Sequence, residues 1–191
     1  MTETILTVKT ERTPNPNSLK YNLGRQLMSE GSNANFPNMD SAERSPLAKR
    51  IFNIKGIVSV FIGNDFVTIT REENINWDDI NQNMAPVLED FFESGEAVVE
   101  GVKPVADKEI GADTENPETI EQIKQLIDEK VRPAVAQDGG DIIYRGFEKG
   151  IVYLEMLGAC SGCPSSGITL KNGVETMLKH YCPDVLEVRA I

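Results

Sequence analysis

The stretch DIIYRGFEKGIVYLEML, residues 141–157, determines the fold expected for the C-terminal part of the chain. β-Branched and aromatic residues dominate two runs within it, 141–147 and 151–157, and Glu148-Lys149-Gly150 separates them. Two such runs around a short connection that contains glycine predict a β-hairpin. Asp138-Gly139-Gly140, just before the first run, predicts a turn.

Helical patterns flank this hairpin on both sides. The preceding segment carries an apolar stripe at helical spacing, and Pro133 is expected to disturb its final turn: Ile120, Ile123, Leu126, Ile127 and Val131. The following segment, from Pro164, carries a second stripe: Leu170, Val174, Met177, Leu178 and Tyr181. A last strand is expected within residues 185–191. The order α-β-β-α-β predicts a two-layer unit whose helices cover one face of a sheet.

The N-terminal half contains its own helix and strand signals. Strands are expected at 4–9 and 19–23, with a turn at 13–17, whose Pro and Asn residues oppose continued pairing. Ser45-Pro46 predicts a capped, short helix over 47–52. A second hairpin is expected over 56–62 and 66–70, and Asn76 is expected to cap a helix that extends to residue 92 and contains Pro86.

These patterns predict an α/β (α+β) protein of two small two-layer domains. The 191 residues suffice for two domains. Residues 94–116 contain Gly, Pro and acidic residues without a sustained period, which predicts a flexible acidic linker. The expected limits are therefore 1–93 for the N-terminal domain, 94–116 for the linker and 117–191 for the C-terminal domain.

Composition and charge exclude several classes of protein. The net charge of -11 opposes non-specific nucleic-acid binding, which needs clustered Lys and Arg. The apolar runs are far shorter than the ~20 residues of a membrane-spanning helix. The first twelve residues carry Glu3 and Glu11 and lack a secretory or transit pattern, which predicts a cytoplasmic location unless a presequence has been removed. Three cysteines, two of them three positions apart, favour metal or redox chemistry over a secreted disulfide framework.

The chemistry is expected at Cys160 and Cys163, which lie in GACSGCPSS, residues 158–166, between a predicted strand and a predicted helix. Two intervening residues let both sulfurs point towards one ion or cluster, and the adjacent glycines let the backbone wrap around it. Free N–H groups at the start of the following helix favour an anionic iron-thiolate centre. We therefore expect both thiolates to be ligands.

One chain offers two thiolates at this position, whereas tetrahedral and iron-sulfur sites commonly use four ligands. His180 and Cys182 are the other candidates. They would lie roughly 25 Å away, at the far end of a helix rising ~1.5 Å per residue, so neither could join Cys160. We expect Cys182 to be dispensable and His180 to be a favourable charge near the helix C-terminus. A two-fold homodimer would supply the missing pair of thiolates.

Two other readings of the cysteine pair stay open from the residues alone. Four thiolates in a dimer also satisfy tetrahedral Zn²⁺, so a zinc-binding module is possible. A C-x-x-C before a helix also suits a thiol-disulfide oxidoreductase, although the proline here follows the pair rather than lying inside it. No nucleophile-base set or phosphate-binding Gly-Lys loop is recognisable, so we expect a protein that is not an enzyme.

The residues also resemble a known family over nearly the whole chain. RP at 132–133, QDGGD at 137–141 and LGACSGCPSS at 157–166 resemble the C-terminal domain of the NifU-like, or Nfu, iron-sulfur scaffold family. TPNPN at 13–17, SPLA at 45–48 and GNDFVT at 63–68 resemble its N-terminal domain. The resemblance identifies no counterpart of Cys182.

The resemblance implies a specific function for the cysteine pair. A [4Fe-4S] cluster would be bridged between two subunits by Cys160 and Cys163 of each and delivered to apo-proteins. Upstream cluster assembly proteins would be further partners. The expected location is the bacterial cytoplasm, or the mitochondrial matrix if a presequence has been removed.

Overall fold

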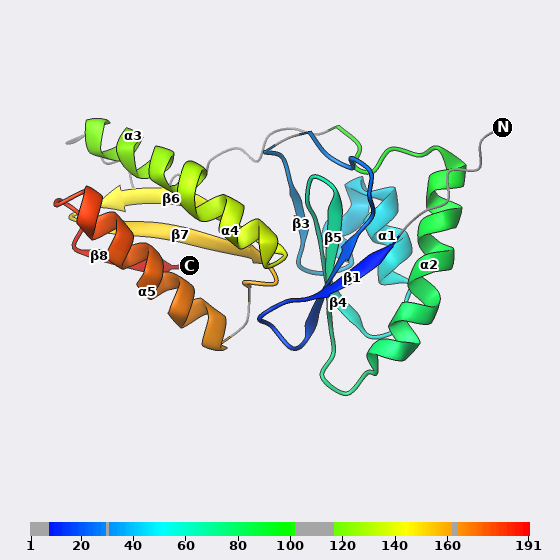
Figure 1. Ribbon diagram of the computed structural model, residues 1–191. Helices are drawn as coiled ribbons and strands as arrows, with labels where there is room; N and C mark the ends of the chain where they lie inside the picture. Colours follow the sequence, from blue (N-terminus) through cyan, green and yellow to red (C-terminus); the bar gives the residue numbers. More distant parts are fainter. Residues whose placement is uncertain (1–7, 30, 102–116, 162–163) are drawn as a thin grey trace. The chain divides into compact units, whose positions relative to one another are not determined.

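The computed structural model describes residues 8–29, 31–101, 117–161 and 164–191, with only the backbone described for 164–169. The chain divides into two compact units, Met1–Pro104 and Val105–Ile191. Each unit combines helices with one sheet, which confirms the expected α+β class (Figure 1). The narrower expected limits of 1–93, 94–116 and 117–191 stay a prediction.

The first unit is built on a five-stranded antiparallel sheet in the order β1-β2-β5-β4-β3. Its strands are β1 (Lys9–Arg12), β2 (Ser18–Asn22), β3 (Ala34–Phe36), β4 (Ile57–Ile62) and β5 (Phe66–Arg71). The hairpin of β4 and β5 is confirmed, as is the strand expected at 19–23. The strand expected at 4–9 falls mostly outside the described residues, and β1 begins where that prediction ends.

The turn at 13–17 joins β1 to β2 and is held together by its own side chains. The Thr13 hydroxyl donates to the carbonyl oxygens of Asn15 and Ser18, at 2.9 and 3.1 Å. The Asn17 amide donates to the Asn15 side chain at 3.0 Å. These bonds replace ladder pairing where proline removes backbone donors. The motif is therefore a structural turn between two paired strands.

Both expected helices of the first unit are present. Helix α1 (Pro46–Phe52) starts after Ser45, whose hydroxyl oxygen accepts from the Ala48 amide at 3.0 Å. Helix α2 (Trp77–Ser94) starts after Asn76 and retains Pro86 inside it. A short 3-10 helix, η1 (Asp40–Arg44), precedes α1 and was not predicted.

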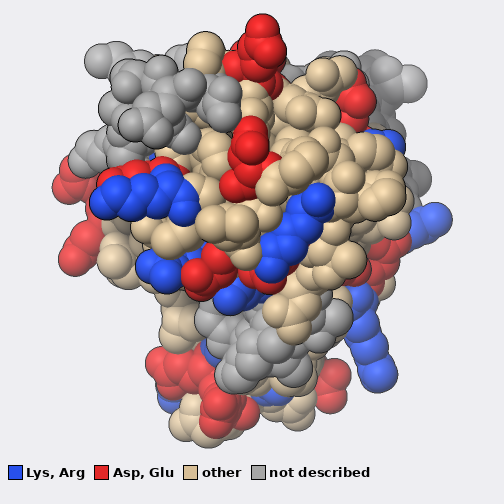
Figure 2. Space-filling view, turned by 90° about the vertical axis from the view of Figure 1, so that its left-hand side faces the viewer, with Lys and Arg blue, Asp and Glu red and all other residues tan. Residues whose placement is uncertain are grey.

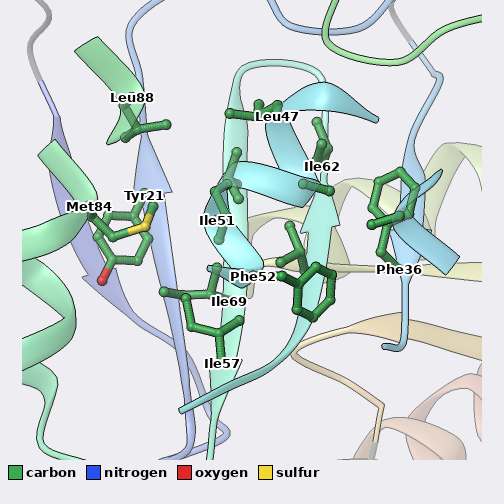
Figure 3. Close-up of a cluster of buried hydrophobic side chains, with 14 of the residues drawn as sticks. Tyr21, Phe36, Leu47, Ile51, Phe52, Ile57, Ile62, Ile69, Met84 and Leu88 are labelled. Atoms are coloured by element: carbon green, nitrogen blue, oxygen red, sulfur yellow. The ribbon is translucent and has the colours of Figure 1, made fainter. Parts of the chain in front are cut away.

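The core of the first unit lies between its sheet and helices α1 and α2, which cover one sheet face (Figures 1 and 3). Alternate residues of β2, β3 and β5 belong to this core, as a two-layer arrangement requires, whereas the residues of β1 are exposed. The contributing side chains come from both layers and include Tyr21, Leu47, Ile51, Ile62, Ile69, Met84 and Leu88.

The segment directly after α2 packs against the first unit and does not form a free linker. Val99 is buried and Val98 packs against the core. The Ser45 hydroxyl donates to the Val98 carbonyl at 2.6 Å, and the Glu100 amide donates to the Arg44 carbonyl at 2.7 Å. The described part of the expected linker thus packs against η1 and α1, while residues 102–116 lie outside the described residues.

The second unit has the expected order α-β-β-α-β. Its strands β6 (Gly140–Glu148), β7 (Ile151–Gly158) and β8 (Glu187–Ala190) form a sheet in which β6 and β7 are antiparallel and β7 and β8 parallel. Helices α3 (Pro117–Leu126), α4 (Arg132–Gln137) and α5 (Pro164–Tyr181) lie on one face of it (Figure 1). Apolar side chains of the helices and the sheet share one core.

The disturbance expected at Pro133 is present as a widened turn just before it. The chain stays helical through it, because a π-helical turn, η2 (Ile127–Val131), separates α3 from α4. Proline lacks an N–H and its ring clashes with the carbonyl four residues earlier in a regular helix. A widened turn just before Pro133 accommodates both defects, and α4 restarts with the proline in its first turn.

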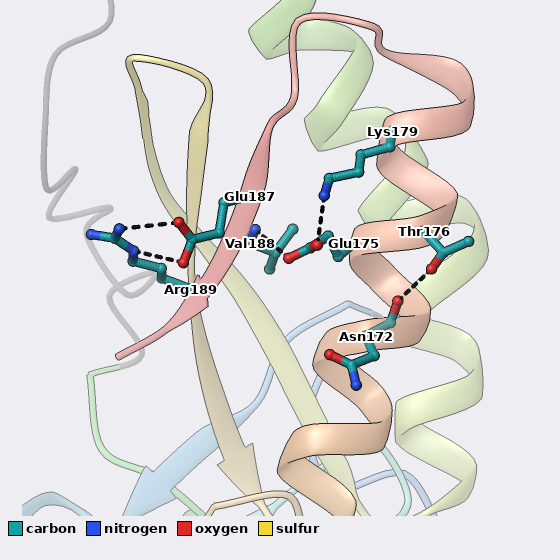
Figure 4. A network of polar contacts seen from close by, with 7 residues as sticks. All are labelled: Asn172, Glu175, Thr176, Lys179, Glu187, Val188 and Arg189. Carbon is teal, nitrogen blue, oxygen red and sulfur yellow. Dashed lines mark hydrogen bonds and ion pairs between the residues drawn. The ribbon is translucent and has the colours of Figure 1, made fainter.

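Glu175 of α5 attaches the last strand to the helix layer (Figure 4). Its carboxylate accepts from the Val188 amide at 2.9 Å and from Lys179 Nζ at 2.7 Å. Both bonds, that from Lys179 first, lower the pKa of Glu175. The carboxylate therefore satisfies a backbone donor of β8 that the parallel ladder leaves available.

Candidate functional site

Cys160 lies two residues beyond the end of β7 and four residues before the start of α5. Its side chain is buried and belongs to the core of the second unit. Gly158, which ends the strand, has φ +65°, the left-handed region that favours glycine. The Ser161 amide then donates to the Gly158 carbonyl at 3.1 Å, closing a tight turn around Cys160. The expected strand–cysteine–helix order is therefore present.

A second glycine turn lies directly beside this one. Gly140 pairs with Gly158 at the end of the β6–β7 ladder, and the Ala159 amide donates to the Gly139 carbonyl at 3.2 Å. The Asp138-Gly139-Gly140 triplet is thus a turn, as expected, but it is also a wall of the cysteine loop. The sequence pattern predicts only the turn, because the pairing with Gly158 is non-local.

The residue after that turn makes a close ion pair. Arg132 binds Asp141 through two parallel bonds, Nε to Oδ1 at 2.9 Å and Nη2 to Oδ2 at 2.7 Å. Asp141 is buried and also accepts from the Ile142 amide at 2.8 Å. Hydrogen bonding to Asp141 raises the pKa of Arg132 above its ordinary value, although burial opposes this. The pair joins α4 to the first residues of β6.

Cys163, the second expected ligand, lies outside the described residues, so its role stays a prediction. The helix expected after it does begin at Pro164. The N-terminus of α5 thus follows directly on the cysteine loop, in the order that the anion-binding argument requires.

Cys182 and His180 lie at the opposite end of α5, which spans 18 residues. The Cys182 thiol is buried in the core, and burial, with a contribution from Asp184, raises its pKa. His180 is exposed and its ring makes an edge contact with Tyr181. The structure therefore brings neither residue to Cys160, as the predicted helix length implied.

The surface in Figure 2 carries Lys and Arg side chains interspersed with Asp and Glu. Mixed charge of this kind differs from the basic stripe of a nucleic-acid-binding face. In the described parts of the chain, no helix is both long and apolar enough to cross a membrane.

The fold and the site together define a class: a two-unit α+β protein that presents a buried cysteine on a glycine-bounded loop between a strand and a helix. Two family models match the chain, "Scaffold protein Nfu/NifU N terminal" over residues 8–95 and "NifU-like domain" over residues 123–189. The chain belongs to the NifU-like (Nfu) family, which confirms the resemblance noted in its sequence.

Individual relatives match almost the entire chain. A Drosophila erecta protein named "NFU1 iron-sulfur cluster scaffold homolog, mitochondrial" is 46% identical over 184 residues, which cover 96% of this chain and 64% of the relative. "NifU-like protein 5, mitochondrial" of Arabidopsis thaliana is 47% identical over 180 residues, covering 93% and 65%. The chain thus spans less than two thirds of the length of these relatives.

A solved structure is also similar to part of the chain. The solution structure of a NifU-like protein from Saccharomyces cerevisiae is 31% identical, with a TM-score of 0.48. It covers 53% of this chain and 92% of its own.

Proposed function

We propose that this protein is an iron-sulfur cluster scaffold and carrier. It binds a [4Fe-4S] cluster through Cys160 and Cys163 of each of two subunits and delivers it to apo-proteins. The observation that carries the proposal is the position of Cys160 on the loop between β7 and α5, in a chain whose relatives are named iron-sulfur cluster scaffolds. The cluster is cargo, supplied by upstream assembly proteins, so no enzymatic turnover is needed.

Sharing between subunits follows from the number of thiolates. One chain supplies two at this loop, and an iron-sulfur cluster commonly binds four. Cys182 cannot contribute, since it lies at the far end of α5, where its thiol is buried in the core and burial raises its pKa. A two-fold axis through the loop completes the ligand set. A cluster held only by two loops at an interface can be released when the interface opens, which suits transfer.

Anaerobic reconstitution with iron and sulfide tests the proposal. We expect about two iron atoms per chain, a dimer in the loaded state, and the Mössbauer spectrum of a [4Fe-4S] cluster. Cys160→Ser and Cys163→Ser should each abolish loading, and Cys182→Ser is the matched control that should not. Tight zinc occupancy without iron would instead establish the zinc module. One cluster per chain would contradict the shared site.

Transfer and location need separate tests. Mixing the loaded protein with an apo [4Fe-4S] protein should restore the cluster absorption of the recipient and deplete the donor. Retention of the cluster by the donor would contradict the carrier role. The location also stays a prediction: the relatives are named mitochondrial, which agrees with the mitochondrial-matrix option and gives no support to the bacterial cytoplasm.

A further inference from the structure

The sulfur of Cys160 lies against the bare Cα of Gly140. A Cβ added at Gly140 would lie 2.8 Å from Cys160 Sγ and 2.6 Å from the Leu157 carbonyl oxygen. Real Cβ atoms essentially never approach other heavy atoms within 3.0 Å. Gly140 has no positive φ, so the backbone conformation itself does not require glycine there. Glycine is required at this position because the Cys160 sulfur and the Leu157 carbonyl oxygen occupy the space that a Cβ would need.

The strand that carries Gly140 is fixed from the helix side. Asp141, the next residue, accepts hydrogen bonds from Nε and Nη2 of Arg132. The third guanidinium nitrogen, Nη1, donates to Asp128 of η2 at 3.2 Å. Parallel bonds of this kind fix orientation as well as distance. The start of β6 therefore has a defined position relative to η2 and α4, and Gly140 has that position too.

We infer that Gly140 and the Arg132–Asp141 ion pair are positioning residues that determine where the Cys160 sulfur points. The inference rests on the proposed function, in which that sulfur is a cluster ligand. Gly140 supplies the surface on which the sulfur lies, and the ion pair holds this surface in place. A thiolate that must meet three others at one cluster needs such a fixed direction, because supporting contacts decide whether a site has the right geometry.

Alkylation of the apo-protein tests the positioning separately from cluster binding. In the full chain with Cys163→Ser, the two remaining thiols are Cys160 and Cys182. Iodoacetamide labelling under native conditions, followed by peptide mass spectrometry, gives a rate for each. Cys182 lies at the other end of α5, so its rate reports any general opening of the unit.

We expect Gly140→Ala to accelerate alkylation of Cys160 several-fold and to leave Cys182 unchanged, because the new methyl group displaces a buried sulfur. Asp141→Asn, which keeps the shape but removes the charge, should have a smaller effect in the same direction. Gly173→Ala is the matched control, since a Cβ there meets nothing within 4 Å. An unchanged Cys160 rate, or a parallel rise at both thiols, would overturn the inference.

Reconstitution supplies the second readout. With Cys163 restored, Gly140→Ala should lower the iron bound per chain while Gly173→Ala retains the wild-type amount. Full loading of Gly140→Ala would overturn the inference even if alkylation changed. If the wild-type chain bound no iron, the proposed function would fail, yet the alkylation rates would still decide whether Gly140 positions Cys160.

Discussion

Replacing Ser45 with alanine should destabilise the first unit more than an ordinary helix cap would. The side chain is fully buried and makes two hydrogen bonds, accepting from the Ala48 amide at 3.0 Å and donating to the Val98 carbonyl at 2.6 Å. Loss of the cap costs about 1 kcal/mol. Loss of the second bond, with a carbonyl left unsatisfied, adds about 1–2 kcal/mol. We expect a total of about 2–3 kcal/mol.

The chain contains a natural probe for this measurement. Its single tryptophan, Trp77, is the first residue of α2, so its fluorescence reports unfolding of the first unit. Urea titration followed at Trp77 gives the free energy of unfolding from the midpoint and slope. The slope should stay unchanged, since the substitution removes two buried hydrogen bonds and does not change the amount of surface exposed on unfolding.

Asn76→Ala is the matched control. Asn76 also caps a helix, accepting from the Asp78 amide at 3.2 Å, but it is exposed and, among the described residues, makes no hydrogen bond to residues 96–101. It should cost about 1 kcal/mol or less. If Ser45→Ala cost no more than Asn76→Ala, the bond to Val98 would contribute nothing, and the reasoning that assigns residues 98–100 to the first unit would be refuted.

Three further predictions concern other parts of the structure. Glu175→Gln should weaken the hydrogen-exchange protection of the Val188 amide at neutral pH by no more than about 1 kcal/mol, because the Glu175–Lys179 ion pair is partly exposed. Since the folded pKa of Glu175 is lowered, this difference should be full above the unfolded pKa of about 4.3 and disappear as the pH falls through the folded value; a constant difference would contradict it. Gly56→Ala should lower the free energy of unfolding, followed at Trp77, by about 3 kcal/mol, because φ is +87° and a Cβ would lie 2.4 Å from the Ile75 side chain. Gly95→Ala is the control and should cost about 1 kcal/mol, because Gly95 has φ +68° but open space around it. Equal losses would show that the Ile75 side chain moves aside and that the clash costs nothing. Cys182→Ser should lower the free energy of unfolding of the second unit by about 1 kcal/mol, measured by circular dichroism, because it buries a hydroxyl group. Iron loading should be retained, and its loss would overturn the ligand assignment.

Local sequence signals account for most of the elements. Ser45-Pro46 and Asn76 fix the starts of α1 and α2, and the stripe after Pro164 fixes α5, because caps and periodic apolar faces act within a few residues. Strand β3 (Ala34–Phe36) escapes prediction for the opposite reason. Its three residues lie among polar, turn-forming neighbours and become a strand through hydrogen bonds to β4, more than twenty positions away.

The candidate site likewise has one feature that local sequence signals predict and one that depends on distant residues. The position of Cys160 between a strand and a helix could be predicted, since both elements carry their own patterns. The contact between Gly140 and the Cys160 sulfur could not, because it depends on which residue of β6 lies opposite Gly158. That register is a property of two strands together.

The register itself depends on an irregularity at Arg145. Next to the hairpin turn, Glu148 pairs with Ile151 and Gly146 with Tyr153, but beyond the irregularity Tyr144 pairs with Leu154. One extra residue in β6 therefore shifts all later pairs by one position, as a β-bulge does.

Counting back from the turn without the bulge would place Gly140 opposite Ala159 and would reverse the faces of residues 140–144. With it, Ile142 and Tyr144 point into the core, and Gly140 ends the ladder opposite Gly158. Arg145 lies five residues from Gly140 along β6, yet the bulge there sets the register that places Gly140 against the Cys160 sulfur. Because Arg145 is the extra residue, its deletion should leave Tyr144 opposite Leu154 and Gly140 opposite Gly158. The alkylation rate of Cys160 should therefore stay close to that of the intact chain, and a large rise would contradict this reasoning.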